Sequence, residues 1–111
     1  MYAQVTHLRV PEGQIGQLRL FIEKEYLPNV SLRPGFIAAH LLEQIDDLDR
    51  AQLVIFWDSQ QALENARHTL SLQGSEQSIA ARLPGLRIER QGYIVRVTTQ
   101  PQEAAAVARV S

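Results

Sequence analysis

One stretch of the chain, residues 52–70, constrains the fold more than any other because it joins an apolar strand directly to a helix. Leu53–Trp57 are five consecutive apolar residues rich in β-branched and aromatic side chains, which is typical of a strand buried on both faces. Asp58 is expected to cap the next helix, with Gln61 completing a capping box. Trp57 then lies beneath a helix start, either as core packing or as the wall of a small-molecule pocket. Apolar residues recur at helical spacing after the cap: Ala62, Leu63, Ala66 and Leu70.

Composition limits the possible partners of this chain. With 111 residues we expect one main domain, residues 1–100, and a C-terminal tail, residues 101–111. Eleven basic and twelve acidic residues give a net charge of −1, so no nucleic acid or anionic membrane is expected as partner. The absence of cysteine excludes disulfides and thiolate metal sites. No apolar run approaches the ~20 residues of a membrane span and no signal peptide is recognised, so we expect a cytoplasmic protein.

The first half of the chain predicts a strand, a helix and a second strand. The first strand is expected over residues 2–10, where apolar and polar residues partly alternate. An amphipathic helix should follow Pro11 and end near Leu27, because Pro28 cannot continue a helix cheaply. Pro34-Gly35 is a turn signal before the second strand, residues 36–45. A polar connection of hairpin length, residues 46–50, then leads into the third strand.

The second half predicts a helix and a closing strand. After the helix that follows Trp57, a short helical resumption is expected from Ser75 to Leu83 before Pro84-Gly85. The last strand should run over residues 86–98, with Gly92 marking a bulge or a close backbone approach. The tail is either loosely ordered or wraps a partner subunit.

This βαββαβ order predicts an α+β fold of the ferredoxin-like, split βαβ type. Right-handed crossovers place both helices on one face of a four-stranded antiparallel sheet, with strand order 4-1-3-2. The second and third strands are apolar at both parities, so the helices leave one apolar face uncovered. A second copy packed sheet against sheet, as a C2 homodimer, would bury that face.

Three segments resemble the antibiotic biosynthesis monooxygenase family of dimeric α+β barrels. They are LPNVSLRPGFIAAHLLEQ, LVIFWDSQQALENA and the closing Tyr93–Val97. The Pro34-Gly35-Phe36 turn and the Trp57-Asp58-Ser59 corner carry most of the likeness, which covers about residues 2–98. The resemblance implies a dimeric α+β barrel with a pocket in each subunit between sheet and helices. It also implies several functions, because some members oxidise aromatic polyketides without a cofactor, others degrade haem, and many have no established activity.

The haem-degrading branch has an asparagine on its first strand, a tryptophan ending its third and an iron-binding histidine on its second helix. Trp57 fits the tryptophan, His68 lies where the histidine is expected to within about one position, and Thr6 stands where the asparagine is expected. This partial match keeps a haem-degrading monooxygenase open as an alternative.

Two other function classes remain open. The first is a cofactor-free monooxygenase of a flat, hydrophobic aromatic, because a deprotonated substrate can itself supply electrons to O2. His40, His68 or a water held by Thr6 would be the base, and Arg67 or Tyr93 would steady the oxyanion. The second is a non-catalytic ligand-binding or structural dimer of the same fold.

The remaining polar residues give no metal or nucleotide site. His7, His40 and His68 lack metal-ligand spacing, and the acidic turn lacks the calcium-loop pattern. We therefore expect no metal and no cofactor. Which histidine faces the pocket depends on a turn register that the sequence does not give.

Overall fold

The computed structural model describes residues 1–70 and 82–100, with the side chains of the last helix of the first range described through Ala66. The order of elements confirms the predicted βαββαβ pattern, in which the first helical segment has three parts. The elements are β1 Tyr2–Arg9, α1 Ile15–Phe21, the π-helical turn Ile22–Tyr26, α2 Leu27–Val30, β2 Phe36–Glu43, β3 Arg50–Trp57, α3 Gln60–Leu70 and β4 Arg87–Ile94.

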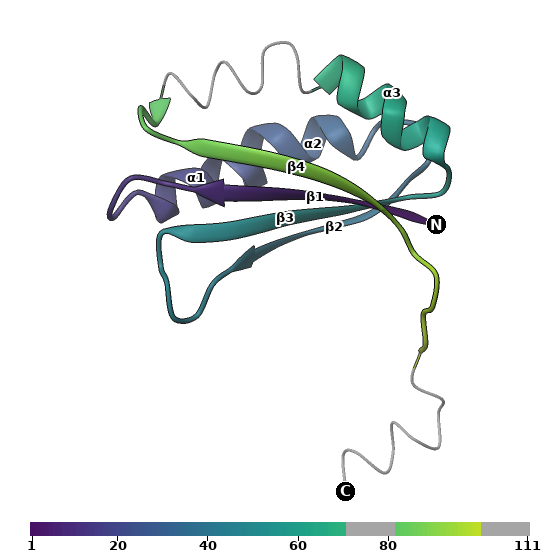
Figure 1. The fold of residues 1–111 in the computed structure, drawn as a ribbon. Helices are drawn as coiled ribbons and strands as arrows, with labels where there is room; N and C mark the ends of the chain where they lie inside the picture. Colours follow the sequence, from purple (N-terminus) through teal and green to yellow (C-terminus); the bar gives the residue numbers. More distant parts are fainter. Residues whose placement is uncertain (71–81, 101–111) are drawn as a thin grey trace, which may run out of the picture.

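The four strands form one antiparallel sheet in the order β2-β3-β1-β4, which is the predicted order. All labelled helices lie on the same side of this sheet (Figure 1). We call the side toward the helices the helix face and the other side the open face. The chain is therefore a two-layer α+β fold of the ferredoxin-like type, as expected.

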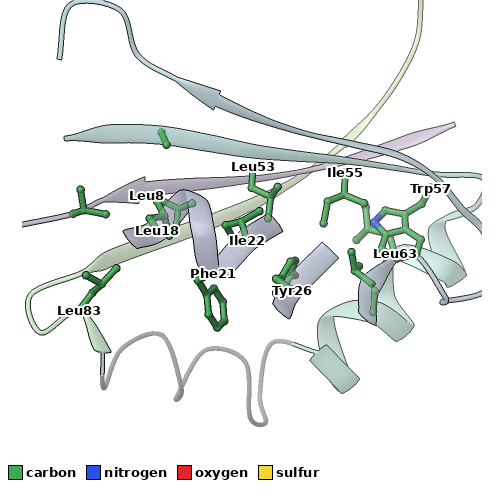
Figure 2. Packing of buried hydrophobic residues seen from close by; sticks show 14 residues of the cluster. Leu8, Leu18, Phe21, Ile22, Tyr26, Leu53, Ile55, Trp57, Leu63 and Leu83 are labelled. Carbon is green, nitrogen blue, oxygen red and sulfur yellow. The ribbon is translucent and has the colours of Figure 1, made fainter. Parts of the chain in front are cut away.

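The hydrophobic core lies between the sheet and the helices (Figure 2). Alternate residues of the central strands point into it, because side chains along a strand alternate between the two faces. The most deeply buried side chains come from β3, α1, α2 and the segment before β4: Trp57, Leu18, Ile55, Leu83 and Val30.

The first helical segment extends beyond its predicted end at Leu27. A π-helical turn, Ile22–Tyr26, is followed by α2, which runs to Val30. Pro28 lies in the first turn of α2, where a missing N–H and a fixed φ are tolerated. The prediction that Pro28 ends the helix is therefore wrong, because the π-helical turn lets proline enter as the start of a new helical unit.

The start of β2 breaks the simple alternation that the sequence predicts. Its pairing with β3 shifts register between Phe36 and Ala38. As a result Phe36 packs against the same core as Ala39 and Leu41, although the sequence pattern places Phe36 on the opposite side. Bulges of this kind reorient all later side chains of a strand.

The corner between β3 and α3 differs from its predicted cap. The Ala62 N–H donates to the Ser59 hydroxyl oxygen at 3.1 Å, so Ser59 and not Asp58 is the helix cap. The Asp58 N–H instead donates to the Gly35 carbonyl at 2.9 Å. This bond ties the Pro34-Gly35-Phe36 turn directly to the Trp57-Asp58-Ser59 corner.

β4 ends at Ile94, four residues before the predicted end of the last strand. Gly92 pairs with Gln4 in regular register, so it marks no bulge. A Cβ on Gly92 would lie 3.7 Å from the Leu63 side chain, so α3 does pass close to the strand here. Most of the predicted helix from Ser75 to Leu83 lies outside the described residues. The predicted tail, residues 101–111, lies wholly outside them.

Candidate functional site

Trp57 is the last residue of β3, and its side chain is fully buried on the helix face (Figure 2). Its ring meets Phe36 edge-to-face at a centroid distance of 5.9 Å. Its indole Nε1–H donates to the Gln4 amide oxygen at 3.4 Å. Of the two interpretations of Trp57, the structure thus supports core packing, with the polar edge of the ring turned toward β1.

The helix face carries a group of polar side chains within an otherwise apolar core. Gln4 and Thr6, both on β1, are buried at 3% and 4% exposure. Thr6 lies directly opposite Arg90 of β4, which is half-buried. Polar groups are costly to bury, so their place in a core usually reflects a specific hydrogen-bonding or functional role. We call Gln4, Thr6 and Arg90 the helix-face polar group.

The π-helical turn lies on the same side of the sheet and ends at Tyr26. The Tyr26 side chain is buried in the core cluster, between the sheet and the outer edge of the helix layer (Figure 2). A π-helical turn is less stable than a continuous α-helix and is frequent at functional sites. It is a second feature that singles out the helix face.

His40 and Tyr93 lie on the other side of the sheet. His40 is exposed on the open face of β2, where its ring contacts Phe56 at a centroid distance of 6.3 Å. Tyr93 is 48% exposed, and its hydroxyl donates to the Gln91 amide oxygen at 2.5 Å. A single chain therefore does not bring these two residues together with Thr6 and Trp57.

The other two residues predicted for the site, Arg67 and His68, belong to α3. Their side chains lie outside the described part of the chain, so their roles remain predictions. His7, which lies beside Thr6 in the sequence, is on the open face. Of the three histidines, two are thus placed away from the helix face.

Two hollows that described residues line include neither Thr6 nor Trp57. One, of about 500 Å³, lies on the open face near His7 and Gln52. The other, of about 450 Å³, lies between α1 and the segment before β4, near Phe21 and Leu83.

Among the described residues no group of three histidine or acidic side chains is arranged to hold a metal ion. No helix in the described part of the chain is long and apolar enough to cross a bilayer.

The fold and the helix-face polar group define the class: a small ferredoxin-like α+β protein with its helices on one face of a four-stranded sheet. The family model described as antibiotic biosynthesis monooxygenase matches residues 1–74. The chain belongs to this family, as the sequence resemblance indicated.

Solved structures agree with this fold at low sequence identity. A candidate antibiotic biosynthesis monooxygenase from Deinococcus radiodurans is 10% identical, with a TM-score of 0.74, covering 90% of this chain and 97% of that one. SnoaB, a cofactor-independent oxygenase from Streptomyces nogalater, is 18% identical with a TM-score of 0.73, covering 87% and 94%. The heme-degrader MhuD from Mycobacterium tuberculosis, with two hemes in its active site, is 18% identical with a TM-score of 0.59, covering 88% and 100%. No curated protein matches the sequence.

Two members of the polar group, Gln4 and Arg90, are absent from the residues that the sequence predicts for the site. Strand parity contains a signal for both. Gln4 has the parity of Thr6 and Leu8, and Arg90 has that of Ile88, so each shares a face with a residue of the core. That signal can be used only once the helix-facing parity of each strand is known.

Proposed function

We propose that the chain is a cofactor-independent monooxygenase of an electron-rich aromatic, with its reaction site on the helix face beside Thr6 and Arg90. The observation that carries the proposal is the helix-face polar group within an otherwise apolar core. Apolar surroundings suit an aromatic ring system, and a few fixed polar groups orient it. Membership in the antibiotic biosynthesis monooxygenase family supports the same class of reaction.

The chemistry needs only a base, a group that stabilises an anion, and exclusion of water. For an anthrone, the base removes a proton from the methylene carbon or its tautomeric hydroxyl. The resulting anion transfers electrons to O2. Anthrone and O2 then yield anthraquinone and water: the CH2 carbon is oxidised to a carbonyl, one oxygen atom enters it, and the other leaves as water.

The chain's own residues have defined roles in this proposal. Arg90 stabilises the substrate anion, because a guanidinium is always charged and binds oxyanions through several N–H groups. The base is a water molecule held by Thr6, and His68 is the alternative base. Trp57 packs the end of the site and does not touch the reacting atoms.

The test follows anthrone oxidation by metal-free protein through quinone absorbance and oxygen uptake. Arg90→Gln should lower kcat/KM about 100-fold, the usual effect of removing an oxyanion-stabilising donor. Thr6→Val, which keeps the side-chain shape, should also lower it, whereas the exposed Arg33→Gln should not. Circular dichroism checks that each variant is folded. Equal activity in Arg90→Gln and Arg33→Gln would contradict the helix-face site.

The same assay separates the roles of the histidines. His68→Gln should lower activity if His68 is the base. If His40→Gln lowers activity and Arg90→Gln does not, the reaction occurs on the open face, where His40 and Tyr93 lie.

A non-catalytic ligand-binding or structural protein is the second candidate, and the complete burial of Trp57 favours the structural form of it. A ring already packed by its own neighbours needs no ligand to cover it. Trp57 fluorescence, followed with a panel of aromatics and with haem, distinguishes the cases. Quenching without turnover supports a binding protein, turnover of haem supports the haem-degrading alternative, and neither result with any compound leaves a structural role.

We also propose that the chain forms a homodimer through the open face. Val5, Val54 and Phe56 lie there on the two central strands, and none of the described helices lies over them (Figure 1). After β4 the chain continues toward the open-face side (Figure 1). Val97, three residues after the end of β4, is 89% exposed. Apolar residues that residues 1–70 and 82–100 leave uncovered favour a second copy as the covering layer.

A further inference from the structure

Three arginines form one row across neighbouring strands at the end of the sheet farthest from Trp57. Arg9 of β1 lies directly opposite Arg50 of β3 on one side and Arg87 of β4 on the other. Neighbouring strands are about 4.8 Å apart. Like charges placed directly opposite each other destabilise a sheet. We call Arg87, Arg9 and Arg50 the arginine row.

Only one member of the arginine row has a carboxylate partner among the described residues. Arg50 pairs with Asp47 of the adjacent turn at 3.0 Å. No described carboxylate pairs with Arg9 or Arg87, and both side chains are exposed. Within the described part of the chain, Arg9 and Arg87 thus occupy paired positions on adjacent strands without a carboxylate partner.

The row borders the cleft of about 500 Å³ on the open face. This volume lies within the range of small-molecule sites, about 300–1,000 Å³. Two carboxylates also line the cleft: Glu43, which is already held by Arg19, and Glu89. With Arg50 and Glu43 each paired, Arg9 and Arg87 outweigh Glu89, so the cleft carries a net positive charge. His7 and Gln52 add hydrogen-bonding groups to its wall.

We propose that this cleft binds a small molecule through an oxyanion group, phosphate or carboxylate, held between Arg9 and Arg87. Guanidinium groups present paired N–H donors that match the oxygens of such anions. A bound anion would also relieve the repulsion within the arginine row. The site lies on the opposite side of the sheet from the proposed oxygenase site, so it is independent of that function.

The cleft and the apolar part of the open face lie toward opposite ends of the same strands. Phe56 and Val54 pair with Ala3 and Val5 toward the Trp57 end of the sheet, whereas the arginine row lies at the other end of the same strands. The homodimer proposed above uses the apolar half of this face.

The test measures binding of inorganic phosphate and of citrate to the full chain by isothermal titration calorimetry at constant ionic strength, set with sodium chloride. Wild-type protein should bind at least one of them in a saturable manner. Phosphate binding alone indicates a phosphorylated ligand, and citrate binding alone indicates a polycarboxylate. Arg9→Gln and Arg87→Gln should each weaken binding by roughly 10-fold or more, as expected for loss of a charged hydrogen-bond donor. Arg33→Gln removes the same charge elsewhere on the surface and should bind like wild type.

Thermal stability gives a second measurement that a merely structural role would not reproduce. Without anion and at low salt, Arg9→Gln should melt above wild type because like-charge repulsion is removed. The same variant should lose the stabilisation that phosphate or citrate gives wild type. The proposal is overturned if neither anion binds wild type, or if Arg33→Gln weakens binding as much as Arg9→Gln and Arg87→Gln do.

Discussion

At the residue scale, the complete burial of the Trp57 ring makes it a main contributor to stability. Trp57→Ala should lower the free energy of unfolding by ~3–5 kcal/mol, through lost burial and the cavity left behind. Trp57→Phe should cost less because much of the apolar contact is kept, although the hydrogen bond to Gln4 is lost. Urea unfolding measures both. An unchanged unfolding midpoint for Trp57→Ala would show that the ring is not packed in solution.

At the scale of elements, Gly35 holds the turn before β2 against the start of α3. Its φ is +86°, and a Cβ there would lie 2.5 Å from both the Ala62 Cβ and the Asp58 carboxylate. Gly35→Ala should therefore destabilise the fold through backbone strain and through a clash with the Ala62 and Asp58 side chains. Gly13 is a matched control, because its φ is +78° and a Cβ there meets nothing within 4 Å.

The two glycine variants separate strain from clash. Gly13→Ala should cost only the strain of a left-handed alanine, roughly 1–2 kcal/mol. Gly35→Ala should cost clearly more, since α3 must shift to admit the methyl group. Equal losses in chemical unfolding would show that the contact between turn and helix is loose.

An ion pair joins α1 to the edge strand β2 and should make stability depend on pH. Arg19 holds Glu43 through two N–H···O contacts, at 2.5 and 2.7 Å. The hydrogen bond and charge of Arg19 lower the pKa of Glu43 below its usual value. A carboxyl whose pKa is depressed by folding stabilises the protein above its unfolded pKa, about 4.3, and loses this contribution as the pH falls through the folded pKa.

The prediction is that Glu43→Gln is less stable than wild type near neutral pH, and that the difference shrinks below about pH 4. The effect should be small and weaken with salt, because the Arg19 side chain is exposed and the Glu43 side chain is partly exposed. Glu12→Gln, an exposed variant without an ion pair among the described residues, should show no such dependence. Thermal melts between pH 3 and 7 measure it, and a difference that stays constant over this range would contradict it.

At the scale of the whole molecule, the open face should pair with that of a second copy. Light scattering at micromolar concentration should give twice the 12.5 kDa mass of the chain. Val54→Lys places a charge on this face and should yield a folded monomer, because an unpaired charge is costly to bury. Leu32→Lys, at a loop residue that is 82% exposed, should remain dimeric. A monomeric wild type would contradict the dimer.

The sequence by itself determined the order of strands and helices, the fold class and the family. These features follow from local patterns: the apolar run ending at Trp57, the helical spacing after it, and the Pro34-Gly35 turn. It also located the corner after β3, but it chose Asp58 as the cap where Ser59 makes the bond. Both residues favour a helix start, and only the path of the chain decides which one reaches the Ala62 N–H.

The tertiary structure decided which residues share a face, and with them the composition of the site. The pairing of β1 with β4 places Thr6 beside Arg90 and Tyr93 on the opposite face. The register shift after Phe36 places His40 on that opposite face as well. The same pairing brings Arg9 between Arg50 and Arg87, which are far apart in the sequence. Strand register depends on long-range pairing and turn geometry, and a one-residue shift moves every side chain to the other face. For this reason the sequence predicts the elements of this protein well and the arrangement of its polar residues poorly.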